Sequence, residues 1–504
     1  MSASNTKKII EMKQTNIAIF FAALILLASC KKFDEFQENP NNPTVADPSL
    51  LLPEIQRTAF SNISSDAALA SRYLVYTQSA SNAQYYGWQR NTMNYGAITQ
   101  VVKMEQEAAR VEKPNYYYLG KFFKAYFIVD MTQRFGDIPY SQMMQSIMNN
   151  NFSDSSATRP VYDKQQDIYR GVLDELKIAS DSLSLDEPPI SGDLVYNGDI
   201  EKWKKLINSF ALRVLMSLSN KEGDGTLNIK ERFNEIVSNP SKYPLISSNS
   251  ENGSLPFYDI TGNQYTYYNN NSMKTDFYLD STFVDILQEN NDPRIFVFGK
   301  PAPASPLPAT DFNAYDGLVG SAPLDYNTGK RGDGMASQIN DRYSYEAINE
   351  PSVLMSYAEV QFLLAEAAHR GWITGSAETF YKAGIEASLE FSNFNNTYSA
   401  GQIVDYLNQP SISLQSGNEI EQIITQKYIS MFMNSGWQPF YEQRRTGFPV
   451  FETARSGILN GGKIPKRWMY PTDEYDNNTV NVENAVRDQF TDGDTVNGLM
   501  WLLQ

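Results

Sequence analysis

The chain has 504 residues and a formal net charge of −16 at pH 7. Hydrophobic residues make up 41% of the sequence and aromatic residues 13%, so the chain can bury a large core. The acidic balance excludes a bulk attraction to nucleic acid or to an anionic membrane surface. The single cysteine excludes zinc and iron–sulfur sites built from several thiolates.

The N-terminal 29 residues predict a secretion signal. A basic start precedes an apolar run over residues 17–27, which is shorter than the roughly 20 residues that a membrane-spanning helix needs. The run ends in Leu27-Ala28-Ser29-Cys30, which resembles the bacterial lipobox, where the chain is cut before the cysteine and the thiol carries lipid. We therefore predict a lipoprotein signal peptide over residues 1–29 and lipidation at Cys30.

The next segment, residues 30–52, is polar and interrupted by prolines, which favours an extended, lipid-anchored tether. After Pro53 the pattern becomes helical, and we predict one domain over residues 53–504. Acyl chains on Cys30 then provide the only attachment to the membrane.

Several segments of the domain carry apolar residues at helical spacing. The predicted helices cover residues 116–135, about 166–179, 200–219, two segments between 357 and 391, and roughly 419–433. Asp163 and Gln166 resemble a capping box at the start of the second helix. The pair within 357–391 resembles a tetratricopeptide hairpin, because small residues on its second helix allow close contact. The predicted fold is mainly α, with tetratricopeptide-like helical pairs.

Two regions break this pattern. Residues 250–278 are rich in Tyr and Asn, and residues 300–350 are rich in Pro, Gly and Asp without periodicity. Between them, Ile295-Phe296-Val297-Phe298 is typical of a strand. Long aperiodic loops in a domain are usually functional or disordered, so we predict that these loops, with minor β elements, form a ligand face.

The residues disfavour most catalytic chemistry. The only histidine, His369, lies at the predicted C-terminal end of a helix, where a cation is favourable for dipole reasons. Catalysis by a Ser-His-Asp or Cys-His set is therefore not expected, although a pair of carboxylates remains open. We interpret Glu359 and Glu366 as structural, and Arg444-Arg445 as the candidate partner of Glu366. Residues 492–498 resemble only the start of a calcium loop, because the closing glutamate is missing, so we predict no metal site and no cofactor.

Aromatic rings among amides outside the helices are the remaining candidates for ligand binding. Sugar faces stack on rings and sugar hydroxyls suit Asn, Gln and Arg, although peptides use the same groups. Trp88 is the first choice. The other candidates are Tyr85, Tyr86, Asn82, Gln84, Arg90, Asn263, Tyr265, Tyr267, Tyr268 and Tyr315. The alternative for each ring is packing on the helical body.

Six segments of the chain resemble motifs of the SusD/RagB (SusD-like) family of nutrient-binding outer-membrane lipoproteins. They are Cys30 with its lipobox, Phe135-Gly136-Asp137-Ile138-Pro139-Tyr140, Trp203-Lys204-Lys205-Leu206, Leu364-Ala365-Glu366-Ala367, Arg444-Arg445-Thr446-Gly447-Phe448-Pro449 and Lys466-Arg467-Trp468-Met469-Tyr470-Pro471. The resemblance implies a largely helical fold and no enzyme activity. It also implies a partner, a SusC-like TonB-dependent outer-membrane transporter.

On this basis we expect a surface-exposed outer-membrane lipoprotein that captures oligosaccharides. Lys31 and Lys32 follow the cysteine directly, whereas export signals of the family are often acidic at this point, so outward orientation is a separate expectation. An oligopeptide ligand, a glycoside hydrolase using two carboxylates, and a scaffold that binds only protein are the alternatives.

Overall fold

The computed structural model describes residues 46–504 of the chain. The predicted signal peptide, Cys30 and the predicted tether up to residue 45 lie outside the described residues. Helix α3 (Pro48–Ala59) already belongs to the folded body, because Leu52 and Ile55 on it are buried. The prediction of a tether up to residue 52 is therefore wrong over its last residues. Proline is favourable in the first turn of a helix, where its missing N–H would have no helical partner.

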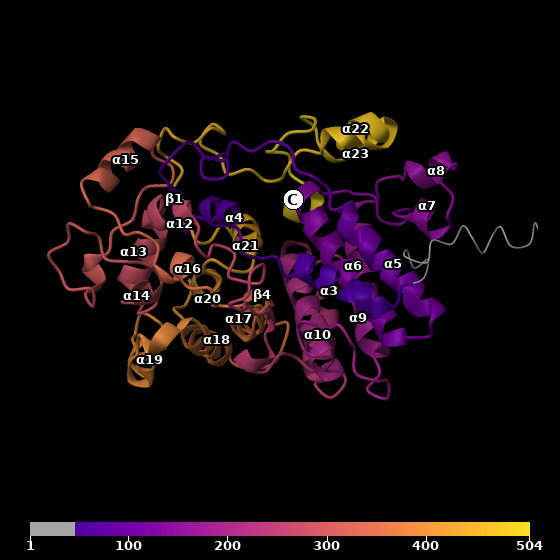
Figure 1. The fold of residues 1–504 in the computed structure, drawn as a ribbon, viewed down its shortest axis with the longest axis horizontal. Coiled ribbons are helices and arrows are strands. Elements are labelled where there is room, and N and C mark those ends of the chain that lie inside the picture. Colours follow the sequence, from indigo (N-terminus) through magenta and orange to yellow (C-terminus); the bar gives the residue numbers. More distant parts are fainter. Residues whose placement is uncertain (1–45) are drawn as a thin grey trace, which may run out of the picture. The chain divides into compact units, whose positions relative to one another are not determined.

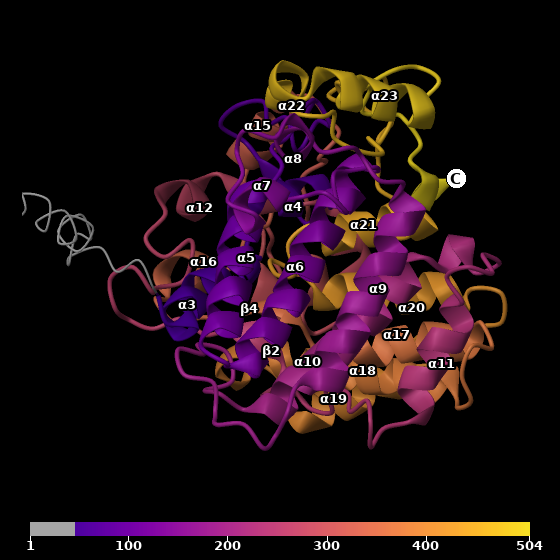
Figure 2. The ribbon, with the colours of Figure 1, turned by 90° about the vertical axis from the view of Figure 1, so that its right-hand side faces the viewer.

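Helices are the main elements of residues 48–504, which form one compact unit (Figures 1 and 2). After α3, the first half contains α4 (Ser65–Ala70), α5 (Tyr95–Arg110), α6 (Pro114–Phe135), α7 (Gln145–Met148), α8 (Ser155–Thr158), α9 (Gln165–Ser182), α10 (Ile200–Ser217) and α11 (Ile229–Ser238). The second half contains α12 (Asn271–Thr275), α13 (Ser281–Glu289), α14 (Ile295–Phe298), α15 (Leu324–Gly332), α16 (Arg342–Tyr345), α17 (Tyr357–His369), α18 (Ala377–Ser392), α19 (Ala400–Leu407), α20 (Glu419–Ser430), α21 (Gln438–Thr446), α22 (Thr472–Asn477) and α23 (Thr479–Gln489).

The long helices pack in the order in which the chain makes them. α5 packs on α6, α6 on α9 and α9 on α10, and both views show these helices side by side (Figures 1 and 2). α10 then contacts α17, which packs on α18 and α20. Each helix buries its apolar stripe on its neighbours, as Ile168, Val172 and Leu176 do on α9. The predicted fold of helical pairs is confirmed.

The hairpin of α17 and α18 is the closest helix pair predicted from the sequence. Gly384 on α18 lies against the ring of Phe362 on α17, so that a Cβ atom there would be 2.8 Å from the ring. A larger side chain at this position would push the two helices apart. His369 is the last residue of α17, as expected from its place after the apolar stripe.

The β structure consists of short antiparallel pairs. β1 (Leu74–Tyr76) pairs with β3 (Phe277–Leu279) in the register Leu74 to Leu279. β2 (Gly253–Leu255) pairs with β4 (Ser352–Met355), with an irregularity between Gly253 and Ser254. Residues 256–270 and 299–323 contain no α-helix and no extended strand, which agrees with the predicted loops, whereas α15 interrupts the second aperiodic region.

Two local predictions are wrong. Residues 295–298 form the single helical turn α14 and not a strand, because the carboxylate of Asp292 accepts the amide of Arg294 and starts the turn. Asp163 does not cap α9. Its carboxylate accepts the amides of Tyr140 and Ser141 instead, and the first amide of α9, that of Gln165, donates to Asp137 at 2.8 Å.

Buried charges tie α10, α17, α20 and α21 together. Glu359 on α17 accepts from Arg213 on α10 at 2.7 Å and lies 3.6 Å from Lys427 on α20. Glu366 lies on the same helix and is only 1% exposed. It accepts two hydrogen bonds from Arg445 on α21. The structural interpretation of both glutamates is confirmed, since removal of one member of such a buried pair is strongly destabilising.

Candidate ligand-binding cleft

The ring of Trp88, the first choice for a ligand contact, is packed inside the protein. It stacks on Trp468, with ring centroids 5.2 Å apart, and meets the rings of Tyr86, Trp437 and Phe440 edge to face. Trp88 is only 8% exposed. The ring faces are therefore occupied by other aromatic residues, and the prediction of Trp88 as a direct stacking platform is wrong.

The neighbouring candidates Gln84, Tyr85 and Tyr86 are also buried. Gln84 accepts the amide of Tyr76 at 2.7 Å, and the hydroxyl of Tyr86 donates to the carbonyl of Ala70. The guanidinium of Arg72 lies over the ring of Tyr86. Within residues 46–504, the amide nitrogen of Gln84 and the hydroxyl of Tyr85 are buried without a hydrogen-bond partner. All three side chains are enclosed by the body, so their contact with a ligand is not supported.

Two candidates of the other segments are interior residues as well. Tyr265 packs edge to face on Phe257 and Tyr267, and the hydroxyl of Tyr315 donates to the carbonyl of Ala309. Both tyrosines are at most 4% exposed. The structure thus brings Tyr265 and Tyr267 together, but it gives Tyr315 a packing role against Phe296.

The remaining candidates are Asn82, Arg90, Asn263, Tyr267 and Tyr268, which are exposed or half-buried. Arg90 is held by Asp494 at 3.1 Å and lies over the ring of Tyr475. The hydroxyl of Tyr267 accepts the amide of Ser65. Asn263 differs from these, because it lines an open cleft and accepts a hydrogen bond of 3.1 Å from Arg57 of α3.

Two neighbouring clefts meet at Arg57 and Ser61. The first, which we call the main cleft, has a volume of about 690 Å³. Its walls come from the end of α3 and the chain after it, from α6, from Asn94, and from Gly436 and Trp437. The lining residues are Glu54, Arg57, Thr58, Ser61, Asn62, Ser64, Asn94, Tyr126, Phe127, Asp130, Arg134, Gly436 and Trp437.

Trp437 is the largest aromatic residue that lines the main cleft. The ring is half-buried, and its inner side meets Trp468 and Trp88 edge to face, at 4.7 Å and 5.7 Å between centroids. Gly436, with φ of 57°, donates its amide to the carbonyl of Asn62 at 2.8 Å and so fixes the turn that presents the ring. The predicted residue Trp88 therefore supports the ring that faces the cleft.

Polar groups stand beside this ring. On α6, Asp130 and Arg134 form an ion pair at 2.9 Å, and the hydroxyl of Tyr126 donates to Asn62 at 3.2 Å. Burial, with a smaller contribution from Asp130, raises the pKa of Tyr126 to about 12. Its hydroxyl thus remains a hydrogen-bond donor at neutral pH. A narrow extension of about 50 Å³ continues inward between α6 and Arg213.

The second cleft, which we call the side cleft, has a volume of about 420 Å³ and adjoins the main cleft along Arg57 and Ser61. The loop over residues 255–266 forms most of its wall, including Phe257, the exposed Tyr258 and Asn263. Sequence reasoning selected this loop but missed Arg57 and Trp437. Ser435-Gly436 before Trp437 is a turn signal, and it could have identified a second loop tryptophan by the criterion that selected Trp88.

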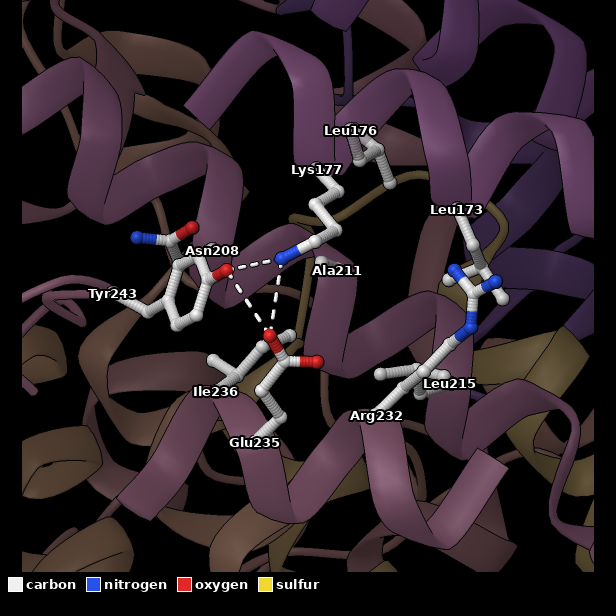
Figure 3. Close-up of a pocket in the computed structure, with 10 residues that line it drawn as sticks. All are labelled: Leu173, Leu176, Lys177, Asn208, Ala211, Leu215, Arg232, Glu235, Ile236 and Tyr243. Carbon is white, nitrogen blue, oxygen red and sulfur yellow. Dashed lines mark hydrogen bonds and ion pairs between the residues drawn. The ribbon is translucent and has the colours of Figure 1, made fainter. Parts of the chain in front are cut away.

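A further cavity between α9, α10 and α11 is too small for such a ligand (Figure 3). It measures about 40 Å³, which is room for only a few water molecules. Leucine side chains form much of its wall, and at one side Glu235 accepts hydrogen bonds from Lys177 at 3.0 Å and from Tyr243 at 3.2 Å. These contacts close a packing gap between helices.

The segment of residues 492–498, which resembles the start of a calcium loop, contributes to ion pairs within the protein. Asp494 accepts hydrogen bonds from Arg467 at 2.7 Å and from Tyr475 at 2.9 Å, and it pairs with Arg90. Two guanidinium groups beside the carboxylate oppose a second cation there. Among residues 46–504, no group of three or more His, Cys, Asp or Glu side chains is arranged to hold a metal ion.

A sequence model of the SusD-like family, described as "Starch-binding associating with outer membrane", matches residues 40–471. An outer-membrane protein of Bacteroides vulgatus named for nutrient binding has 36% sequence identity and a TM-score of 0.84, covering 91% of this chain and 100% of that chain. A SusD homologue of Bacteroides fragilis has 39% identity and a TM-score of 0.83, covering 91% and 99%. A chitin-binding protein has 26% identity and a TM-score of 0.73, again covering 91% and 99%.

Among curated proteins, no significant match is found. No helix within residues 46–504 has both the length and the apolar character to cross a membrane. The family match extends over most of the sequence, and the two Bacteroides structures share the fold over nearly their whole length. The chain belongs to the SusD-like family of outer-membrane-associated nutrient-binding proteins.

Proposed function

We propose that this protein captures oligosaccharides in the main cleft without cleaving them and delivers them to a SusC-like TonB-dependent transporter. Acyl chains on Cys30 hold it at the outer membrane, facing outward. Membership of a family described as starch-binding supports the glycan, as does the similarity to a chitin-binding protein. The observation that carries the proposal is the half-buried ring of Trp437 beside hydroxyl and amide groups in a cleft of about 690 Å³.

This combination of groups suits a sugar. The C–H face of a pyranose ring stacks on an aromatic ring, while its hydroxyls bond to planar groups and hydroxyls. The main cleft offers Trp437 for stacking, Asn62 and Asn94 as amides, and Thr58 and Ser61 as hydroxyls. A cleft that orients a ligand with a few polar groups is the usual form of a small-molecule site. An oligopeptide is the alternative ligand, since amide groups would bond to the same side chains.

The direct test replaces Trp437 with alanine and measures binding of maltooligosaccharides, chitooligosaccharides and oligopeptides of similar length. Loss of the main aromatic contact of a site costs about 2 kcal/mol or more, which corresponds to roughly 30-fold weaker binding. Trp501→Ala is the matched control, because this half-buried tryptophan lies against Lys221 and lines neither cleft. Unchanged glycan affinity of Trp437→Ala would remove the main cleft as the glycan site.

A glycoside hydrolase would instead need two carboxyl groups, one acting as the acid and the other as the base. An acidic cleft of about 570 Å³ between α13 and α20 is lined by Asp285, Glu289, Glu421 and Glu452. Burial, assisted by the nearby Glu289, raises the pKa of Asp285. Incubation with each bound glycan and analysis of the products tests this alternative. Cleavage that is abolished in Asp285→Asn would contradict the proposed non-catalytic role.

Delivery to a transporter is tested separately. A tagged protein isolated from the outer membrane of its own cells should bring a TonB-dependent barrel with it, and deletion of that barrel should stop uptake of the bound glycan. Growth on the glycan without the barrel would contradict the delivery step but not the capture step.

A further inference from the structure

The junction between the two clefts carries a guanidinium group without an ionic partner. Arg57 lies in the last turn of α3, is exposed, and lines both the main cleft and the side cleft. Its only side-chain hydrogen bond in the described chain goes from Nη2 to Asn263 Oδ1, at 3.1 Å. Within residues 46–504, no carboxylate lies within ion-pair distance of Arg57, so its charge has no ionic partner in either cleft.

The other arginines of this region are neutralised. Arg134 in the main cleft pairs with Asp130 at 2.9 Å, and Arg213 donates a hydrogen bond of 2.7 Å to the carboxylate of Glu359. Glu54 lines the main cleft about one turn before Arg57, yet no ion pair within 4 Å joins them. In a chain with a net charge of −16, Arg57 is thus an available positive group at the centre of the site.

An uncharged sugar does not require such a group, because the neighbouring hydroxyls and amides already match its hydroxyls. A carboxylate does, since the guanidinium fork binds it through two parallel hydrogen bonds. Asn263 holds one side of the fork, which restricts its orientation and makes Asn263 a positioning residue. Asn263 was also one of the polar candidates that we selected from the sequence.

The position of Arg57 also indicates where the carboxylate lies in the ligand. Arg57 lines both clefts; Thr58 and Trp437 line only the main cleft, and Tyr258 and Gln264 line only the side cleft. A ligand that fills both clefts passes Arg57 with units on each side of it. An acidic group within the chain fits this arrangement, whereas a carboxylate at the end of a peptide would leave one cleft empty.

We propose that the two clefts form one extended site and that Arg57 selects glycans with a uronic acid inside the chain. This proposal rests on the proposed glycan capture. It adds the acidic class of the sugar, the side cleft as a second part of the site, and Arg57 as the residue that determines specificity.

The test compares each acidic glycan with its neutral form. Oligogalacturonides, oligoglucuronates and oligomannuronates are titrated against the full-length protein, each beside its fully methyl-esterified counterpart. We expect at least one acidic glycan to bind about tenfold or more tightly than its ester, a typical range for a charge-assisted contact. The preference should decrease as salt is added, because the contact is exposed.

Three variants identify the source of the preference. Arg57→Gln should bind the acidic glycan and its ester equally, because the charge that distinguishes them is removed. Glu54→Gln should strengthen binding of the acidic form about two- to threefold, since a nearby like charge is removed. Arg455→Gln, which makes the same change in net charge at an exposed site outside both clefts, should keep the preference.

Equal binding of acidic and esterified glycans by the parent protein, or an unchanged preference in Arg57→Gln, would overturn the proposal. If neutral glycans still bind and lose affinity in Trp437→Ala, only the uronate proposal fails and glycan capture stands. Absence of binding to every glycan, acidic or neutral, would overturn both proposals.

Discussion

The guanidinium of Arg445 binds the carboxylate of Glu366 through two hydrogen bonds, Nη1 to Oε1 at 2.6 Å and Nη2 to Oε2 at 2.7 Å. Arg445 also bonds to Glu442 on its own helix, and Glu442 pairs with Lys427 at 3.1 Å. Burial alone would raise the pKa of Glu366, but Arg445 overcomes this effect and holds the pKa below its ordinary 4.5. The pair therefore remains ionised at neutral pH and joins α17 to α21.

Replacing Glu366 with alanine leaves this buried guanidinium short of a partner. Removal of one member of a buried pair costs about 3–5 kcal/mol, and we expect the free energy of unfolding to fall by this amount in urea titrations. Glu386→Ala, at an exposed position of α18, is the matched control and should change stability by less than about 0.5 kcal/mol. A parent-like transition for Glu366→Ala would contradict the role of the pair.

Asp137 predicts a pH dependence of stability with the opposite sign from that of most carboxylates. Burial raises its pKa from 3.8 to about 6, although the hydrogen bond from the amide of Gln165 acts against this change. Between these two values the folded state binds more protons than the unfolded state. The stability that Asp137 contributes is thus fully present below about pH 3.8 and is lost as the pH rises through about 6.

Asp137→Asn keeps an acceptor for Gln165 but does not titrate. Relative to the parent, this variant should gain on the order of 2–3 kcal/mol as the pH increases from 4 to 7, since one pKa unit corresponds to about 1.4 kcal/mol. Asp137→Ala should show the same gain with pH but lie about 1 kcal/mol lower throughout, because the first amide of α9 loses its cap. Parallel pH profiles for the parent and Asp137→Asn would show that the pKa is not raised.

Trp88→Ala should now act on stability before it acts on the ligand. The ring is surrounded by Tyr86, Trp437, Phe440 and Trp468, and truncation of a buried tryptophan costs about 3–5 kcal/mol. Thermal unfolding should begin at a lower temperature, and Trp88→Phe should recover part of the loss. A parent-like melting temperature together with lost glycan binding would restore Trp88 as a direct ligand contact.

Cys30→Ser tests the anchor predicted from the sequence. Without the thiol the precursor should be neither lipidated nor cut before residue 30, and the protein should leave the membrane fraction. The body from α3 onward should melt as in the parent, because the substitution lies in the predicted tether and not in the folded domain. Membrane retention of Cys30→Ser at the parent level would contradict lipidation as the anchor.

The helical part of the fold could be predicted because its signals are local. Apolar stripes at helical spacing identified α6, α9, α10, α17, α18 and α20. The position of Glu366 on an apolar helix predicted a cationic partner, and the candidate pair of arginines contains that partner, Arg445. The errors concern element ends and one short segment, residues 295–298, which is helical and not extended. Asp163 has the correct residue type for a cap, but Asp137, from a segment before it, reaches the amide of Gln165 first.

The candidate site was harder to predict because burial of a loop ring depends on distant segments. The stacking partner of Trp88 is Trp468, and nothing near residue 88 shows that this surface will be covered. Asn263, a candidate from the sequence, lines the side cleft, but its partner Arg57 belongs to the segment that adjoins the predicted tether. Pairing between such separate segments is a tertiary property that the local pattern does not contain.

The three tryptophans Trp88, Trp437 and Trp468 are half of the six in the chain, and they touch one another at one edge of the main cleft. Arg134, which also lines the cleft, lies over the ring of Trp468. Excitation absorbed by any of these rings can pass to its neighbours, and their emission responds to the polarity around Trp437. The intrinsic tryptophan fluorescence of the unlabelled protein should therefore change when a ligand binds. A ligand that displaces water from the ring of Trp437 should alter the combined emission of all three tryptophans.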